Sequence, residues 1–445
     1  MKVLMRLTAL LIILAFPFLN AHAQAPIALS MSEAIERALR YNLGITSATQ
    51  EERVRAADRV KALYDMYPKV AGQLAGVQQQ INLAAFGFGG FPGISSVVGP
   101  FSLVDARARM TQSVFDRKLV HDLREARENE HAAAFATENT REIVVLTVAN
   151  FYLQALSAAS RISAVEAQVA RAQTLYNRAV DLKNSGLVAG IDVLRAQVEL
   201  QSQQQRLLAF RNDFALLKLN LVRAIGVPFA QEITLTDAMP VDTPPSPRVE
   251  EALQIAMENR QDLRRADSLL RAAQHALDSA RSEKLPTLDF DSDYGAIGRS
   301  PGQSHGTYSM RGQVNIPIFN RNETRSDRLE AEARLKQRVL EADDLRAQVE
   351  MDVRASYLDL NSAGEQVRVA QSSLVLTRQQ LDQAQDRFEA GVAGNLEVVQ
   401  AQETVALADE NVISSLYSFN VAKARLARAM GTAQQTLKAF FGGTR

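Results

Sequence analysis

The sequence predicts a mostly α-helical protein with a transmembrane β-barrel portion, built from two duplicated halves. Three observations predict this class: an internal repeat, heptad patterns too long for a globular domain, and short segments in which apolar and polar residues alternate. Apolar residues make up 47% of the 445 residues and charged residues 22%, which excludes a disordered chain and a polytopic helical membrane protein. Basic and acidic residues both number 50, so no basic excess indicates nucleic-acid binding.

Residues 1–23 are predicted to be a cleaved signal peptide. Lys2 and Arg6 precede an apolar stretch that ends at Leu19, and Ala21-His22-Ala23 has the small-x-small pattern of a cleavage site. The alternative is a transmembrane anchor, but this stretch is shorter than the roughly 20 apolar residues that span a bilayer. We therefore expect the mature chain to be periplasmic, secreted, or inserted in a membrane as a β-barrel.

The mature chain repeats one half-protein. Glu33-Ala34-Ile35 recurs as Glu251-Ala252-Leu253, and Ala224-Ile225-Gly226 recurs as Ala429-Met430-Gly431. The period is too long for a solenoid unit, so we interpret it as a duplication. The sequence predicts a first repeat, a Pro-rich linker, a second repeat and a C-terminal tail, at residues 24–240, 241–248, 249–431 and 432–445.

Each repeat is predicted to contain a helix, a β-hairpin, a very long helix, a tight tip and a return helix. The last four elements are expected at 67–115, 117–183, 184–192 and 193–226 in the first repeat, and at 285–319, 321–388, 389–396 and 397–431 in the second. Apolar residues from Val144 to Ala179 follow alternating spacings of 4 and 3, and the equivalent seam from Val349 to Ala384 is largely apolar as well. Helices of this length reach about 100 Å.

The hairpin segments predict membrane-spanning strands. Phe290 and Tyr294 alternate with acidic residues, and Ala108 and Met110 alternate with basic and hydroxyl residues. The charged side of these strands is expected to face water in the barrel lumen: Asp289, Asp291, Asp293, Arg107 and Arg109. A soluble half-buried strand shows the same alternation, and the seam alone would fit a dimeric coiled coil. Several such strands between long helices, behind a signal peptide, favour the barrel.

Two hairpins supply only four strands, which cannot close a barrel, and open sheet edges are not tolerated in lipid. Two chains would give eight strands and a filled interior, whereas three chains would give twelve and room for a pore. The charged inward faces favour three chains.

The whole mature chain resembles a TolC-type outer-membrane efflux protein. The most specific match is the segment from Asn184 to Val193, in which Gly186-Leu187 is followed by Asp192-Val193; the segment from Glu389 to Val398 is similar to the partner turn. Phe115-Asp116 and Phe319-Asn320 also fit the family. The resemblance implies a homotrimer with a 12-strand barrel in outer-membrane lipid and a helical tunnel across the periplasm. It also implies a periplasmic adaptor and an inner-membrane pump as partners, and small-molecule or exported substrates.

The two tips are the candidate functional sites. The resemblance implies that adaptor hairpins dock on them, at Gly186, Leu187, Val188, Gly391 and Val392. Asp192 and Glu397 occupy matching positions, and three copies of each would place acid rings at the periplasmic mouth. The simpler reading of Asp192 is a carboxylate in the first turn of a helix. Gln400, Ala393 and Phe388 depart from the residues that lock the mouth elsewhere in the family.

Catalysis is not expected. The chain has no Cys, its five His are scattered along the sequence, and no motif of a metalloprotease, a serine hydrolase or a nucleotide-binding loop occurs. We therefore expect no enzyme activity, cofactor or metal site. The Gly- and Phe-rich segment 86–93 is predicted to be an external loop. The alternative function is a periplasmic coiled-coil adaptor or scaffold without a channel.

Overall fold

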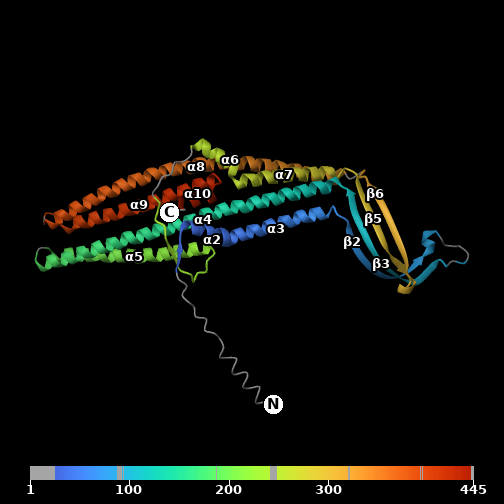
Figure 1. Ribbon diagram of the computed structural model, residues 1–445, viewed down its shortest axis with the longest axis horizontal. Coiled ribbons are helices and arrows are strands. Elements are labelled where there is room, and N and C mark those ends of the chain that lie inside the picture. Colours follow the sequence, from blue (N-terminus) through green and yellow to red (C-terminus); the bar gives the residue numbers. More distant parts are fainter. Residues whose placement is uncertain are drawn as a thin grey trace, which may run out of the picture.

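The computed structural model describes residues 26–87, 93, 95–186, 188–240, 248–318, 321–390, 392 and 394–441. The predicted signal peptide and nearly all of the predicted linker lie outside these residues, as does most of the 86–93 segment. Long helices run along the molecule, with two helical hairpin tips at one end and a β-sheet at the other (Figure 1).

The two repeats contain the same elements in the same order. The first comprises α2 (Met31–Tyr41), α3 (Leu43–Tyr64), β2 (Lys69–Asn82), β3 (Val97–Phe115), α4 (Arg117–Asn184) and α5 (Gly190–Ala224). The second comprises α6 (Val249–Asn259), α7 (Gln261–Ser282), β5 (Thr287–Gly298), β6 (His305–Asn315), α8 (Arg321–Glu389) and α9 (Asn395–Ala429). The predicted mostly helical class with duplicated halves and four hairpin strands is confirmed.

Three details differ from the sequence prediction. The single opening helix of each repeat is broken in two, at Asn42 and at Arg260, where the backbone is extended. Two three-residue strands, β1 (Ile27–Leu29) and β4 (Ile233–Leu235), form a separate parallel pair. The predicted C-terminal tail contains a helix, α10 (Ala433–Phe441). The strands β1 and β4 are too short to show a periodic pattern in the sequence.

The helix breaks are held by the glycines that end each repeat. Gly226 has a φ of +70° and packs against Tyr41, and Gly431 has a φ of +71° and packs against Arg260. The Asn42 side-chain amide donates a hydrogen bond of 2.9 Å to the carbonyl of Ala224. Each repeat is therefore closed by the same contact between its last turn and its first helix break.

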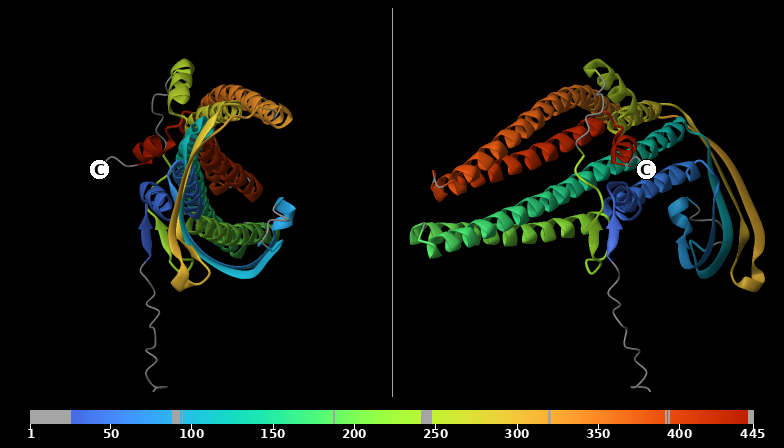
Figure 2. Two further views of the ribbon diagram at one scale, coloured as in Figure 1. Left: turned by 90° about the vertical axis from the view of Figure 1, so that its right-hand side faces the viewer. Right: turned by 60° about the vertical axis from the view of Figure 1, so that its left-hand side comes forward.

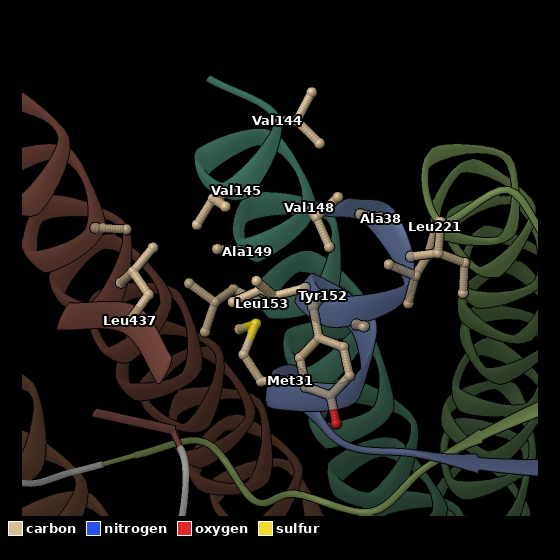
Figure 3. Packing of buried hydrophobic residues seen from close by; sticks show 14 of the residues in the cluster. Met31, Ala38, Val144, Val145, Val148, Ala149, Tyr152, Leu153, Leu221 and Leu437 are labelled. Atoms are coloured by element: carbon tan, nitrogen blue, oxygen red, sulfur yellow. The ribbon is translucent and has the colours of Figure 1, made fainter. Parts of the chain in front are cut away.

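The main core lies at mid-length, where α2, α4, α5, α9 and α10 meet (Figure 3). Tyr152 and Leu153 of α4, Met31 of α2 and Leu437 of α10 are fully buried there. The Tyr152 hydroxyl lies 2.8 Å from the carbonyl oxygen of Leu29 and 3.0 Å from Oδ2 of Asp237. Among the described residues, α4 has a stretch apolar enough to cross a membrane, but half of that stretch is buried inside the protein.

The predicted seams lie in the helix packing. Val148 and Ala179 in α4 are fully buried, as are Val349 and Val353 of the equivalent seam in α8. The second repeat thus has a core of its own, in which α6 and α9 pack on α8.

The four hairpin strands form one antiparallel sheet in the order β2-β3-β5-β6. The central pair, β3 and β5, joins one repeat to the other. Figure 2 shows the sheet bent into a curved wall at the end of the helices. Asp116, whose carboxylate accepts a 2.8 Å hydrogen bond from the backbone of Lys118, caps α4 directly after β3. β3 therefore passes into α4 through a single residue.

Candidate functional site: a polar sheet face and two helical tips

All five residues predicted to face the lumen share one face of the sheet. Thr111 pairs with Asp291 across β3 and β5, and Arg109 pairs with Asp293. Residues directly opposite in an antiparallel pair point to the same side, and so do residues two apart in one strand. The register therefore adds Arg107 and Asp289 to this polar face.

Ion pairs and hydrogen bonds connect the polar face. Arg107 lies 2.8 Å from a carboxylate oxygen of Asp105 and 2.8 Å from one of Asp293. Ser309 on β6 donates a hydrogen bond of 2.7 Å to Asp293. At the base of the sheet a hollow of about 540 Å³ is lined by Asp289, Asp291 and other polar side chains. This face of the sheet is therefore polar and charged.

The opposite face of the sheet is apolar and open. Leu74 is 77% exposed, and the paired Tyr294 and Tyr308 are 72% and 74% exposed. By contrast, the side chains of Arg107 and Asp293 on the polar face are only 18% and 16% exposed. The sheet thus curves around its charges and presents its apolar side outward, which is the arrangement of a barrel wall in lipid.

The first tip is a tight turn between α4 and α5. Gly186 has a φ of +73°, and its amide donates a hydrogen bond of 2.9 Å to the carbonyl of Lys183. Only glycine adopts this left-handed conformation readily, so the helix ends here. Val188 is half-buried. Leu187, predicted to contact the adaptor, lies outside the described residues.

The second tip joins α8 to α9. Val392 is 70% exposed, and its amide donates a hydrogen bond of 3.0 Å to the carbonyl of Arg387. Gly391 lies outside the described residues. Leu396, in the first turn of α9, is 51% exposed. An apolar surface so far from the main core is therefore open at this tip.

The two predicted aperture acids occupy equivalent places. Asp192 lies in the first turn of α5 and Glu397 in the first turn of α9. Each contacts an arginine of its own hairpin: Asp192 is 3.5 Å from Arg195, and Glu397 is 3.5 Å from Arg387. The structure does not pair the two acids with one another.

The hairpins pack together close to the tips. Leu175 and Ala196 of the first hairpin share a buried cluster with Leu381 and Val398 of the second. Beside this cluster, a groove of about 360 Å³ lies between the hairpins. Its lining is apolar and basic: Leu175, Phe388, Val398, Arg171 and Arg178, with neighbouring polar residues.

The matching family model describes outer membrane efflux proteins, and it covers residues 34–227 and 252–432. The two matched segments coincide with the two structural repeats. This chain belongs to the outer membrane efflux protein family. It is therefore a non-enzymatic outer-membrane channel of tripartite efflux or type I secretion systems, and it extends into the periplasm. The alternative of an adaptor or scaffold without a channel is wrong.

Individual relatives agree with this assignment. The toluene efflux pump outer membrane protein TtgC of Pseudomonas putida is 24% identical over 90% of this chain and 83% of its own length. The outer membrane protein TolC of Escherichia coli is 21% identical over 74% of this chain and 69% of its own. The crystal structure of VceC from Vibrio cholerae superposes with a TM-score of 0.79 at 16% identity, over 90% of this chain and 96% of that one.

One charged network was not predicted from the sequence. It lies at the break between α6 and α7, against Gly431 at the end of the second repeat. Arg260, only 5% exposed, makes two hydrogen bonds to Asp262, of 2.6 and 3.0 Å, and one of 2.9 Å to Asp352. Burial alone would raise the pKa of Asp262, but the hydrogen bonds and charge of Arg260 outweigh it and lower the pKa. In the sequence, the only indication of this network is that Arg260 corresponds to Asn42 of the first repeat.

Proposed function

We propose that three copies of this chain close a 12-strand barrel in the outer membrane and form a passive exit duct through the periplasm. The observation that carries the proposal is the pair of open edges. In the described part of the chain, β2 and β6 each pair with one strand only. Because neighbouring strands run antiparallel throughout the sheet, β6 of one copy can continue into β2 of the next without breaking the pattern. Lipid does not tolerate open edges, so ring closure removes them.

Exposed apolar side chains on the helices support the same assembly. Leu208 and Leu216 on α5 and Leu358 and Leu376 on α8 are each more than half exposed in the single chain. Neighbouring copies in a trimer would cover such positions. The polar sheet face would then line the barrel lumen, and the helices would form the tunnel below it.

Introduced cysteines test the ring, because the natural chain contains none. Leu74→Cys on β2 is combined in turn with Cys at outward positions of β6, such as Tyr308 and Met310. Oxidation of the best pair should give a covalent trimer on denaturing gels, whereas each single variant should stay monomeric. Dimers from a single variant would indicate a two-fold interface and contradict the ring.

We further propose that the tips are where the periplasmic adaptor docks and that the pump behind it supplies energy and chooses the substrate. The exposed Val392 and Leu396 provide apolar contact area, and the groove next to Phe388 offers an apolar site flanked by Arg171 and Arg178. Double substitution of Val392 and Leu396 by Ser should reduce adaptor binding without changing trimer yield. Unchanged adaptor binding would refute docking at this tip.

The acids Asp192 and Glu397 are proposed to line the closed mouth as rings. Divalent cations should then block current in planar bilayers, and D192A/E397A should weaken the block. The nearby arginines partly neutralise the rings, so Arg387→Gln should strengthen it. Unchanged block in both variants would leave the acids as first-turn carboxylates that act only within their own helices.

A further inference from the structure

Two histidines from different repeats meet where α4 packs against α7. The helices run in opposite directions, and salt bridges of 2.9 Å join Lys118 to Glu283 and Glu128 to Arg271. His121 faces α7 between these two salt bridges, and the His121 and His275 ring centroids lie 6.2 Å apart. The histidines are scattered along the sequence, but the fold brings these two together.

Asp278 completes a compact group of three. His121, His275 and Asp278 each offer one metal-ligating atom, and these atoms all lie within 4.8 Å of one another. Oδ1 of Asp278 lies 3.4 Å from Nε2 of Gln274 and 3.5 Å from Nη1 of Arg281, both on its own helix. These contacts are weak enough for a metal ion to displace.

The imidazoles have unused ligand atoms. His121 is only 6% exposed, and the Nδ1 atoms of His121 and His275 are both buried with no hydrogen-bond partner among the described residues. Buried polar atoms in folded proteins nearly always have a hydrogen-bond partner, so two unpartnered ones near each other point to a missing ligand.

We propose that His121, His275 and Asp278 bind a divalent transition-metal ion, with Zn²⁺ as the reference ion. Two imidazole nitrogens and one carboxylate oxygen suit Zn²⁺ and Co²⁺, whereas Mg²⁺ and Ca²⁺ prefer oxygen ligands alone. Metal–ligand bonds of about 2.0–2.2 Å require the three atoms to move closer together by roughly 1 Å. Side-chain rotation supplies this movement, and a water molecule completes the tetrahedron.

The bound ion would link the first repeat to the second, because its ligands come from both α4 and α7. His121 lies soon after β3 passes into α4, and His275 lies in the last part of α7 before β5. β3 and β5 are the strands through which the two halves of the sheet pair. A bound ion at this junction would therefore hold together the helices from which both central strands emerge, and would stabilise the folded protein by mass action.

Binding is tested on the purified full-length protein carrying no histidine tag. Isothermal titration with Zn²⁺ should give one site per chain in the natural protein. In H121A/H275A the affinity should fall at least a hundredfold. The matched control is H131A/H305A, which removes two exposed histidines and leaves the same total number. Its affinity should equal that of the natural protein.

Two further measurements keep the result independent of folding defects and of channel function. Co²⁺ should produce the visible absorption bands of a tetrahedral site in the natural protein and in H131A/H305A, and Asp278→Asn should change them. Zn²⁺ should raise the melting temperature of the natural protein but not that of H121A/H275A, each compared with its own metal-free sample. Equal Zn²⁺ affinities in the two double variants, or loss of binding in H131A/H305A alone, would overturn the proposal. A failure of the trimer proposal leaves it unaffected, because all three ligands belong to one chain.

Discussion

Glycine-to-alanine substitutions test the contact between the last turn of each repeat and its first helix break. The glycines compared all have a left-handed backbone, but Gly186 lies at a tip whereas Gly226 and Gly431 end the repeats. Gly186 and Gly226 have nearly the same φ, +73° and +70°. A Cβ atom at Gly186 would have no neighbour within 4 Å, whereas at Gly226 it would lie 2.8 Å from both Cβ and the carbonyl oxygen of Tyr41. Alanine therefore has the same backbone strain at both sites, but only at Gly226 would its Cβ atom overlap with neighbouring atoms.

The magnitudes follow from these distances. A left-handed non-glycine residue costs about 1–2 kcal/mol, and reduced freedom of the unfolded chain returns about 0.4–1 kcal/mol. Gly186→Ala should therefore lower the free energy of unfolding by roughly 0–1.6 kcal/mol. At Gly226 the backbone of Tyr41 cannot rotate away, so overpacking adds a further 1–3 kcal/mol. Gly431→Ala should behave like Gly226→Ala, because its Cβ would lie 2.9 Å from the backbone nitrogen of Arg260.

The assay is thermal unfolding of the detergent-solubilised protein by circular dichroism, because the chain has no Trp for fluorescence. For a chain of 445 residues, 1 kcal/mol corresponds to about 1 °C in melting temperature. All variants are compared at one scan rate, because the melting temperature of an irreversibly unfolding protein depends on the scan rate. If Gly226→Ala and Gly431→Ala melt within error of Gly186→Ala, the closure contact contributes nothing and the reasoning fails.

Two further outcomes are expected. Single cysteines on the polar sheet face, at Asp289, Asp291 or Asp293, should react with a charged thiol reagent in the assembled protein. Cys at Phe290 on the opposite face should react slowly, and equal rates at all four positions would contradict the barrel. Glu142 accepts backbone hydrogen bonds from the start of α10, and burial raises the pKa of its carboxyl group. The folded protein therefore binds this proton more tightly than the unfolded chain does. The resulting contribution to stability is present at low pH and is lost as pH rises through the raised pKa. The melting temperature of the natural protein relative to Glu142→Gln should therefore increase as pH falls from 7 towards 4.5, and an unchanged difference would show that Glu142 stays ionised.

The sequence alone determined the duplicated architecture and the faces of its elements. Periodicity fixes which side of a helix or strand is apolar, so the seam through Val148 and Val349 and the charged row through Asp291 could be read without coordinates. The tip at Gly186 could also be predicted from the sequence, because a glycine that follows a helical heptad pattern commonly ends the helix. These features depend on residues close together in the chain.

Only the tertiary structure decided which distant residues meet. The pairing of His121 with His275, of Arg260 with Asp352, and of Glu142 with the start of α10 joins residues about a hundred or more positions apart. None of these pairs leaves a periodic pattern, because each depends on the register at which segments distant in the sequence pack. That register is set by side-chain interlocking along the whole interface, so the chemistry of such contacts emerges only when these segments have packed against each other.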